Sequence, residues 1–211
     1  MSKDKLYIIG AGSVGGHIAR NITAYSEHFE IAGFFDDDPQ KIGSELYNYP
    51  VLGPVSNALS LENEAVIIGI AFPEVKKKLV EILFQNLTLK FPALVHGKAW
   101  ISNEVSVGMG SVIYPGTSVN YGSMIGDHVL INMNCALGHH TVVENFSSLA
   151  PGVNTGGHST IQECVDVGIG VSTLQNVTIG SGSIIGGQAF VNRDIPSDSK
   201  AVGVPARAKK K

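Results

Sequence analysis

Residues 119–149 read VNYGSMIGDHVLINMNCALGHHTVVENFSSL, and an aliphatic residue stands at every sixth position of this stretch. The same spacing runs without a gap from Val95 to Val191, where fifteen of seventeen positions hold Val, Ile or Leu and two hold Thr. Helices and ordinary strands repeat at about 3.6 and 2 residues, so neither explains a period of six. The period predicts a parallel β-helix, whose chain turns after every six residues and closes one coil in three turns.

The other positions of the six-residue unit agree with such a coil. The aliphatic residue opens the unit and is expected to point inward. The residue four places later is usually small or β-branched, as at Ser111, Thr117 and Cys135, which suits a tight corner. Glycine often follows the inward residue, where a missing Cβ eases a bend. These glycines are Gly108, Gly126, Gly138, Gly168, Gly180 and Gly186.

The first ninety residues follow a different pattern, in which strands and helices alternate. Apolar strands are expected at residues 6–9, 31–35 and 65–70, with amphipathic helices after the first and third. The second helix is expected to bury Val75, Leu79, Ile82 and Leu83. This alternation predicts a small parallel sheet, which is an α/β half-Rossmann domain.

A glycine-rich turn links the first strand to the first helix. Gly10, Gly12 and Gly15 have the spacing of a dinucleotide-binding turn, and Asp36 follows Gly15 by 21 residues, near where a ribose-binding acid is expected. Only one mononucleotide half is present, so we expect a site for a single nucleotide group. The predicted contacts are Gly12, Ser13, Val14, Asp36 and Asp37. In the alternative interpretation, the glycines only permit a tight turn.

Composition narrows the class of protein. A formal net charge of −3 gives no general affinity for nucleic acid, and no apolar run reaches the length of a membrane span. Cys135 and Cys164 fall inside the repeat at spacings that suggest no zinc site, so we expect no metal. We expect a cytoplasmic protein with three parts: residues 1–92, residues 93–196 and a carboxyl-terminal tail at residues 197–211.

The half-Rossmann domain, the uninterrupted repeat and the endings VNRDIP at residues 191–196 and VGVPAR at residues 202–207 resemble one family. It is the sugar O-acyltransferase family of hexapeptide-repeat enzymes, which includes sialic acid O-acetyltransferases and N-acetyltransferases of UDP-4-amino sugars and GDP-perosamine. The resemblance implies a left-handed β-helix and a homotrimer with active sites between neighbouring prisms. It also implies acetyl-CoA as the co-substrate.

The function implied is transfer of acetyl to the amine of a nucleotide-linked amino sugar, of the UDP-4-amino-4,6-dideoxy type, for surface glycan biosynthesis. One alternative is O-acetylation of sialic acid or of a polysaccharide precursor. Two more distant alternatives are a metalloenzyme of the γ-carbonic anhydrase type, which needs three converging histidines, and an inactive nucleotide-sugar-binding protein. Direct transfer is expected, because neither cysteine has a positive local setting that would activate its thiol.

Residues 132–140, NMNCALGHH, carry the expected chemistry. In the bacillosamine-pathway N-acetyltransferase that this stretch resembles, an Asn precedes the general-base His by seven residues and an acid follows the His. Asn132 and His139 match those roles, and His140 takes the place of the acid. His140 is expected either to orient His139 through a hydrogen bond or to contact substrate. Otherwise both histidines are ordinary exposed residues, as His158 is expected to be.

The repeat also indicates where acetyl-CoA lies. Adjacent coils are spaced by about 4.8 Å, so an extended pantetheine arm would cross several of them. Residues 18 apart share a column, and Ile169 and Gly187 form such a pair. Both match positions that contact the coenzyme in the related enzyme. Ser148 matches a further contact, which is a His in that enzyme.

Overall fold

The computed structural model describes residues 3–211. The chain divides into two compact units, Met1–Leu94 and Val95–Lys211. Neither helix in the described residues is long and apolar enough to cross a membrane.

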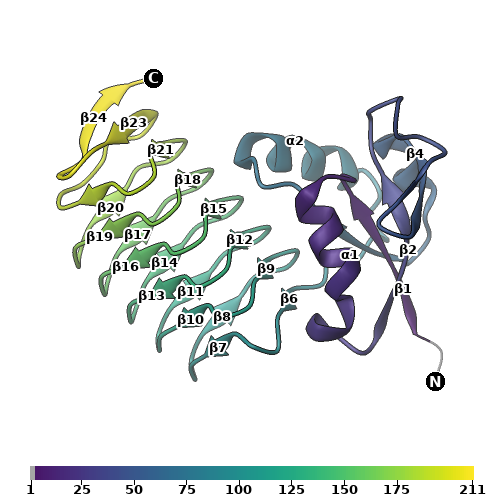
Figure 1. Cartoon of the computed structure of the whole chain (residues 1–211), viewed down its shortest axis with the longest axis horizontal. Helices are drawn as coiled ribbons and strands as arrows, with labels where there is room; N and C mark the ends of the chain where they lie inside the picture. The colour runs from purple at the N-terminus through teal and green to yellow at the C-terminus, as the bar shows by residue number, and fades with distance from the viewer. Residues whose placement is uncertain (1–2) are drawn as a thin grey trace. The chain divides into compact units, whose positions relative to one another are not determined.

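The first unit is a five-stranded sheet with strand order β3-β4-β2-β1-β5 (Figure 1). Strand β2 lies at its centre, and β1 lies between β2 and β5 and pairs in parallel with both. Its regular elements are β1 (Asp4–Ile9), α1 (Ser13–Tyr25), β2 (Phe29–Phe35), β3 (Glu45–Leu46), β4 (Tyr49–Gly53), the 3₁₀ helix η1 (Val55–Ser60), β5 (Ala65–Ile68) and α2 (Pro73–Leu83). The predicted strand-helix alternation is therefore present, and β1, β2 and β5 end at one edge, as parallel strands require.

The hairpin of β3 and β4 was absent from the sequence prediction. Its turn residues Tyr47 and Asn48 both have positive φ, at 55° and 69°. Two-residue hairpin turns with positive φ usually contain an Asn-Gly or Asp-Gly pair, and this chain has neither at this position. Pro50 also makes β4 hard to predict from the sequence, because proline is uncommon inside strands.

The buried face of α2 differs from the prediction. Val75 and Ile82 are exposed, which the sequence prediction had wrong. The buried stripe is Lys76, Leu79, Val80 and Leu83. These positions follow the i, i+3, i+4, i+7 spacing of one helix face, so the aliphatic stem of a lysine takes a place that hydrophobicity alone assigned to Val75.

The second unit is a left-handed β-helix with three parallel faces. The first face contains β7 (Trp100–Ile101), β10 (Ser118–Val119), β13 (Ala136–Leu137), β16 (Asn154–Thr155), β19 (Ser172–Thr173) and β22 (Phe190–Val191). The second contains β8 (Ser106–Val107), β11 (Met124–Ile125), β14 (Val142–Val143), β17 (Thr160–Ile161) and β20 (Thr178–Ile179). The third contains β6 (Leu94–Val95), β9 (Val112–Ile113), β12 (Leu130–Ile131), β15 (Ser148–Leu149), β18 (Asp166–Val167), β21 (Ile184–Ile185), β23 (Ser199–Val202) and β24 (Arg207–Lys210).

Each six-residue unit uses its backbone in the same way. From Ile113 onward the first residue is inward and buried, as Ile161 and Ile179 are at 0% exposure, and these two, 18 positions apart, pair with each other. In the units that begin at Ile101 to Ile185, the third residue after the inward one takes a left-handed conformation, whether it is glycine or not. The glycine directly after the inward residue was predicted to ease a bend, but the structure shows that it makes room for the next coil. A Cβ on Gly108 would lie 2.5 Å from the carbonyl carbon of Gly126, so the backbone of the next coil excludes a side chain there.

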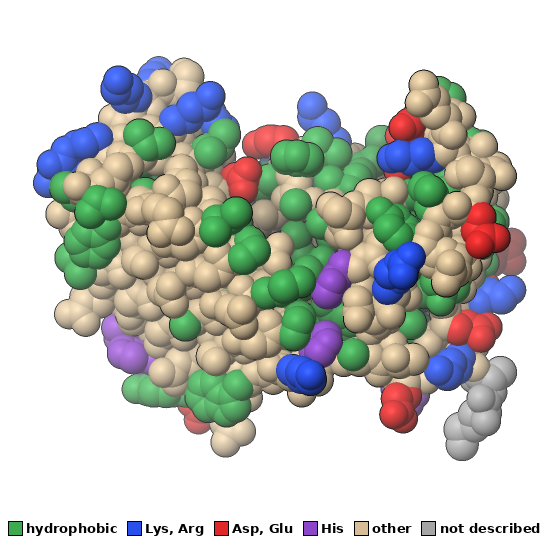
Figure 2. Space-filling view, in the orientation of Figure 1, with side chains coloured by type: hydrophobic (Ala, Val, Ile, Leu, Met, Phe, Trp, Pro, Cys, Tyr) green, Lys and Arg blue, Asp and Glu red, His purple; other side chains and the backbone are tan. Residues whose placement is uncertain are grey.

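The last fifteen residues are more than a tail. Strand β23 pairs in parallel with β21, and β24 returns antiparallel to β23, so both extend the third face. Basic side chains gather over these two strands at the upper left of Figure 2. The basic residues of the two strands are Lys200, Arg207, Lys209 and Lys210.

Candidate functional site

Three histidines meet in the turns that join the first face to the second. His139 and His140 follow β13, and His158 occupies the equivalent turn after β16, one coil later. Nδ1 of His139 lies 3.1 Å from Nδ1 of His140. The ring of His158 stacks on His140 with centroids 4.7 Å apart, and it meets His139 edge-on at 5.0 Å. We call these three residues the histidine corner. The family resemblance singled out His139 and His140, whereas His158 was expected to be an ordinary surface residue.

Neighbouring coils make room for these rings. His140 and His158 both occupy the left-handed position of their turns, with φ of 55° and 56°. A Cβ on Gly157 would approach Cε1 of His139 to 2.7 Å, and one on Gly122 would approach Cδ2 of His140 to 2.8 Å. The imidazoles therefore lie over glycines of adjacent coils, and any larger residue at those positions would displace them.

The ring of Tyr121 completes the surroundings of the pair. Tyr121 precedes His139 by one coil and stacks on it with centroids 5.5 Å apart. It meets His140 edge-on at 5.1 Å. The His139 ring thus lies between an aromatic ring in the preceding coil and Gly157 in the following one, which limits its rotation.

The two threonines of the inward row lie beneath these turns. Thr155 Oγ1 accepts a hydrogen bond from the amide of Gly138, the residue before His139, at 3.1 Å, and it lies 3.0 Å from the hydroxyl of Thr141. Thr173 Oγ1 accepts in the same way from Gly156. Both threonines are only 8% exposed, and buried hydroxyls persist where they are hydrogen-bonded. The two threonines that interrupt the aliphatic row therefore accept hydrogen bonds from the turns that carry the histidines.

Asn132 lies at the other end of the first face. It begins the turn before β13, whereas His139 lies in the turn after β13. At about 3.3 Å per extended residue, more than about 10 Å of chain separates them. The Asn132 carboxamide oxygen accepts a hydrogen bond from the amide of Met133 at 2.8 Å, which leaves its NH₂ group as a donor. Within one chain, Asn132 and His139 do not share a site.

The predicted coenzyme column also lies in turns that precede the first face. Ile169 is 59% exposed, and Gly187 occupies the equivalent place one coil later. Among the described residues, neither of their amide groups has an acceptor, so both can bind a ligand carbonyl. Ser148 differs, because it is 4% exposed on β15. The structure therefore does not bring Ser148 to the same exposed column.

In the first unit, a cavity of about 380 Å³ lies at the carboxyl edge of the sheet. It is lined by the glycine turn and by the segment after β5, namely Gly10, Gly12, Ser13, Val14, Asp36, Lys41, Gly69, Ile70, Ala71, Phe72 and Val75. Ligands of open α/β sheets bind at this edge, where the strands end. Four of the five predicted nucleotide contacts line this cavity, and Lys41 is a cation that the sequence prediction missed.

Asp36 is bound to its own chain. Its Oδ2 accepts from the amide of Ala11 at 2.7 Å and from Lys41 Nζ at 3.0 Å, and its Oδ1 accepts from the amide of Asp38. Burial by itself would raise the pKa of this carboxyl, but the hydrogen bonds and the lysine outweigh burial and lower the pKa below its ordinary value. The ionised carboxylate of Asp36 thus holds the glycine turn in place through the amide of Ala11.

Asp37 has a similar structural role. Its Oδ1 accepts from the amide of Val55 at 2.8 Å, at the start of η1. It contributes to a smaller cavity of about 210 Å³ that also contains Gly10 and Asp36. Both carboxylates that were predicted to bind a ribose or base therefore accept hydrogen bonds from protein backbone. A ligand could donate only to the lone pairs that these bonds leave free.

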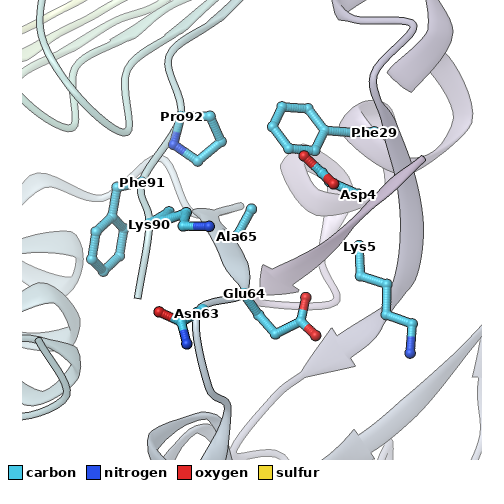
Figure 3. A pocket seen from close by; sticks show the side chains of 9 residues that line it. All are labelled: Asp4, Lys5, Phe29, Asn63, Glu64, Ala65, Lys90, Phe91 and Pro92. Carbon is cyan, nitrogen blue, oxygen red and sulfur yellow. The ribbon is translucent and has the colours of Figure 1, made fainter. Parts of the chain in front are cut away.

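A third cavity, of about 320 Å³, lies at the opposite edge of the same sheet (Figure 3). Asp4, Phe29 and Ala65, the first residues of β1, β2 and β5, line it together with Glu64 and Lys90. It has no glycine turn and no helix amino terminus. Its place at the amino ends of the strands makes it a poor nucleotide site.

The cysteines are unsuited to carry an acyl group. Cys135 is 1% exposed and Cys164 is 8% exposed. Burial raises the pKa of the Cys135 thiol, which disfavours the nucleophilic thiolate. The expectation of direct transfer agrees with this setting.

Both units are similar to known proteins. Residues 5–83 match the family model of the PglD N-terminal domain. The acetyltransferase domain of PglB from Neisseria gonorrhoeae, solved with acetyl coenzyme A, is 28% identical with a TM-score of 0.89 over 99% of this chain and 100% of that chain. A mutant perosamine N-acetyltransferase from Caulobacter crescentus, solved with CoA and GDP-perosamine, is 25% identical with a TM-score of 0.89 over 100% and 99% of the two chains.

Sequence relatives match this chain over a shorter stretch. A serine acetyltransferase of Buchnera aphidicola is 34% identical over 141 residues, which cover 63% of this chain and 43% of that enzyme. The matches to this and similar relatives span less than half of their own length.

Proposed function

We propose that this chain, which belongs to the hexapeptide-repeat sugar acetyltransferases with a PglD-type amino-terminal domain, transfers acetyl from acetyl-CoA to the amine of a nucleotide-linked amino sugar. The observation that carries the proposal is the histidine corner, in which the imidazoles of His139 and His140 lie within hydrogen-bond distance on an aliphatic coil. We further propose a sugar of the UDP-4-amino-4,6-dideoxy type, a role in surface glycan biosynthesis and a cytoplasmic location.

His139 acts as the general base. When the Nδ1–H of His139 donates to Nδ1 of His140, Nε2 of His139 is left to accept the proton of the substrate amine. The amine nitrogen then attacks the thioester carbonyl, the C–S bond breaks, and the sulfur of CoA leaves and takes up a proton. His140 thereby fixes the tautomer of the base, the task that an acidic residue performs in the bacillosamine-pathway enzyme.

The nucleotide binds in the cavity of the first unit. The amides of Gly12, Ser13 and Val14 open helix α1, and a helix amino terminus favours phosphate. Lys41 adds the cation that a diphosphate needs. Asp36 orients both the turn and the lysine, while Asp37 holds the start of η1 beside the smaller neighbouring cavity.

Acetyl-CoA lies along the column of Ile169 and Gly187, with the free amides of these residues facing its pantetheine carbonyls. The column continues toward β23 and β24, whose basic residues suit the phosphates of the coenzyme. We retain Ser148 only as a weaker contact because of its burial.

We infer a homotrimer from where these parts lie on the coil. The coenzyme column and Asn132 belong to turns before the first face, whereas His139 belongs to turns after it. A site that combines them requires the His139 of one protomer and the coenzyme column of its neighbour. Three prisms arranged head to tail in a ring supply three such sites.

O-acetylation is the alternative function. A sugar hydroxyl could lose its proton to the same base, so the histidine corner does not exclude it. The PglB and perosamine enzymes, one of them solved with an amino-sugar nucleotide, favour the amine.

The first test removes the base. His139→Ala should lower kcat for acetyl transfer by about 10²–10⁴-fold with little change in the affinity for acetyl-CoA, because proton abstraction alone is lost. Turnover would be followed by CoA release with a panel of UDP-, GDP- and CMP-linked amino sugars. His28→Gln, an exposed histidine before β2, is the matched control. Turnover of His139→Ala within about threefold of wild type would reject the assignment.

The second test asks whether the site is shared. Gly187→Trp should block the coenzyme column, and His139→Ala should remove the base, so each variant alone should be inactive. Refolding the two together at equal amounts should restore about a quarter of the sites, those that pair an intact His139 with an intact neighbouring column. Mixed protein that stays inactive while light scattering shows mixed trimers would exclude the shared site.

The third test concerns nucleotide binding. Lys41→Ala should raise KM for the nucleotide sugar by about tenfold or more, the loss of one charge-assisted hydrogen bond, and should leave KM for acetyl-CoA unchanged. Lys78→Ala, an exposed lysine on α2, controls for the lost charge. A folded Lys41→Ala variant with wild-type KM for the nucleotide sugar would show that this lysine only supports Asp36.

A further inference from the structure

We propose that the histidine corner is also a binding site for a divalent transition-metal ion such as Zn²⁺, and that an ion bound there inhibits the enzyme. The evidence is geometric. His139, His140 and His158 each offer a ring nitrogen, and the three nitrogens lie within 4.8 Å of one another. All three come from one chain, so the site requires no partner subunit.

The distances are close to those of a three-histidine site. Zn²⁺ binds imidazole nitrogens at about 2.0–2.1 Å, which in a tetrahedral arrangement places ligand atoms about 3.3 Å apart. The Nδ1 atoms of His139 and His140 are already 3.1 Å apart. His140 and His158 are exposed, so a small rotation of their rings would close the widest gap.

The backbone holds the donors in place before any ion binds. His140 and His158 repeat the same left-handed turn one coil apart, and Gly157 leaves His139 its space over the next coil. Three ligands on two adjacent rungs of a rigid coil need little ordering on binding, and preorganisation of this kind raises affinity.

The chemistry of the donors selects the ion. The group consists of three imidazoles with no carboxylate. Imidazole suits Zn²⁺, Cu²⁺ and Ni²⁺, whereas Mg²⁺ and Ca²⁺ require oxygen ligands. Three protein ligands leave a fourth position for water.

Inhibition follows from the identity of the ligands. An ion bound at Nδ1 of His139 would displace the proton shared with His140. The neutral imidazole would then carry its proton on Nε2, which would leave no lone pair there to accept the substrate proton. This consequence rests on the proposed function, whereas the binding itself does not.

Binding is tested directly on the untagged protein by equilibrium dialysis with Zn²⁺ and by visible absorption with Co²⁺, whose bands are intense in four-coordinate sites. Wild type should bind one ion per chain. His158→Gln and His140→Gln should each weaken binding by at least about tenfold, because each loses a direct ligand. His28→Gln should bind as wild type does. Failure of wild type to bind a stoichiometric ion, or wild-type affinity in His158→Gln, would overturn the proposal.

Inhibition is tested separately. Zn²⁺ should inhibit turnover of wild type and His28→Gln at the concentration at which dialysis shows binding, and His158→Gln should need at least about tenfold more. Stoichiometric binding that leaves wild-type turnover unchanged would show that His139 is not a ligand. If no acceptor sugar is turned over at all, dialysis and the Co²⁺ spectrum still decide the metal site, so its failure is distinct from that of the proposed enzyme activity.

Discussion

Closure of a coil every eighteen residues is the constraint on which the second unit depends. Each six-residue segment must bury its first side chain and turn three residues after that side chain. It must also pair its backbone with the neighbouring coil. Side chains at the other positions of the segment therefore line up in columns, in which each residue lies eighteen positions after the one before. The histidines, the glycines beneath them and the coenzyme column all owe their positions to this repetition.

The inward row departs from aliphatic residues only where chemistry is expected. Thr155 and Thr173 exchange some apolar burial for hydroxyls that hold the turns after β13 and β16. An unsatisfied buried hydroxyl would cost about 1–3 kcal/mol, but here each one accepts from a glycine amide. The amide of Gly138 donates both to the carbonyl oxygen of Thr155 and to its hydroxyl, each at 3.1 Å, so the hydroxyl adds a second acceptor beneath the turn that carries His139.

Much of the fold was readable from the sequence because the period is strict. The inward row and the glycine turn followed from spacing, and the His139–His140 pair was singled out by the family resemblance. The stacking of His158 on His140 did not, since it depends on a column eighteen residues apart and on ring orientation. Lys41 and the hairpin of β3 and β4 also escaped prediction, because neither lies in a periodic segment. The roles of Asp36 and Asp37 as anchors of their own backbone required distances.

The claim that the buried Thr155 hydroxyl positions the base is tested most directly by the kcat of Thr155→Val. The variant should fold, lose about tenfold or more in kcat through misplacement of His139, and keep its KM for acetyl-CoA. Thr155→Ser should restore turnover, because it returns the hydroxyl. Ser111→Ala, which removes a buried hydroxyl from a turn between the second and third faces, should leave turnover unchanged. A folded Thr155→Val variant with wild-type kcat would contradict the claim.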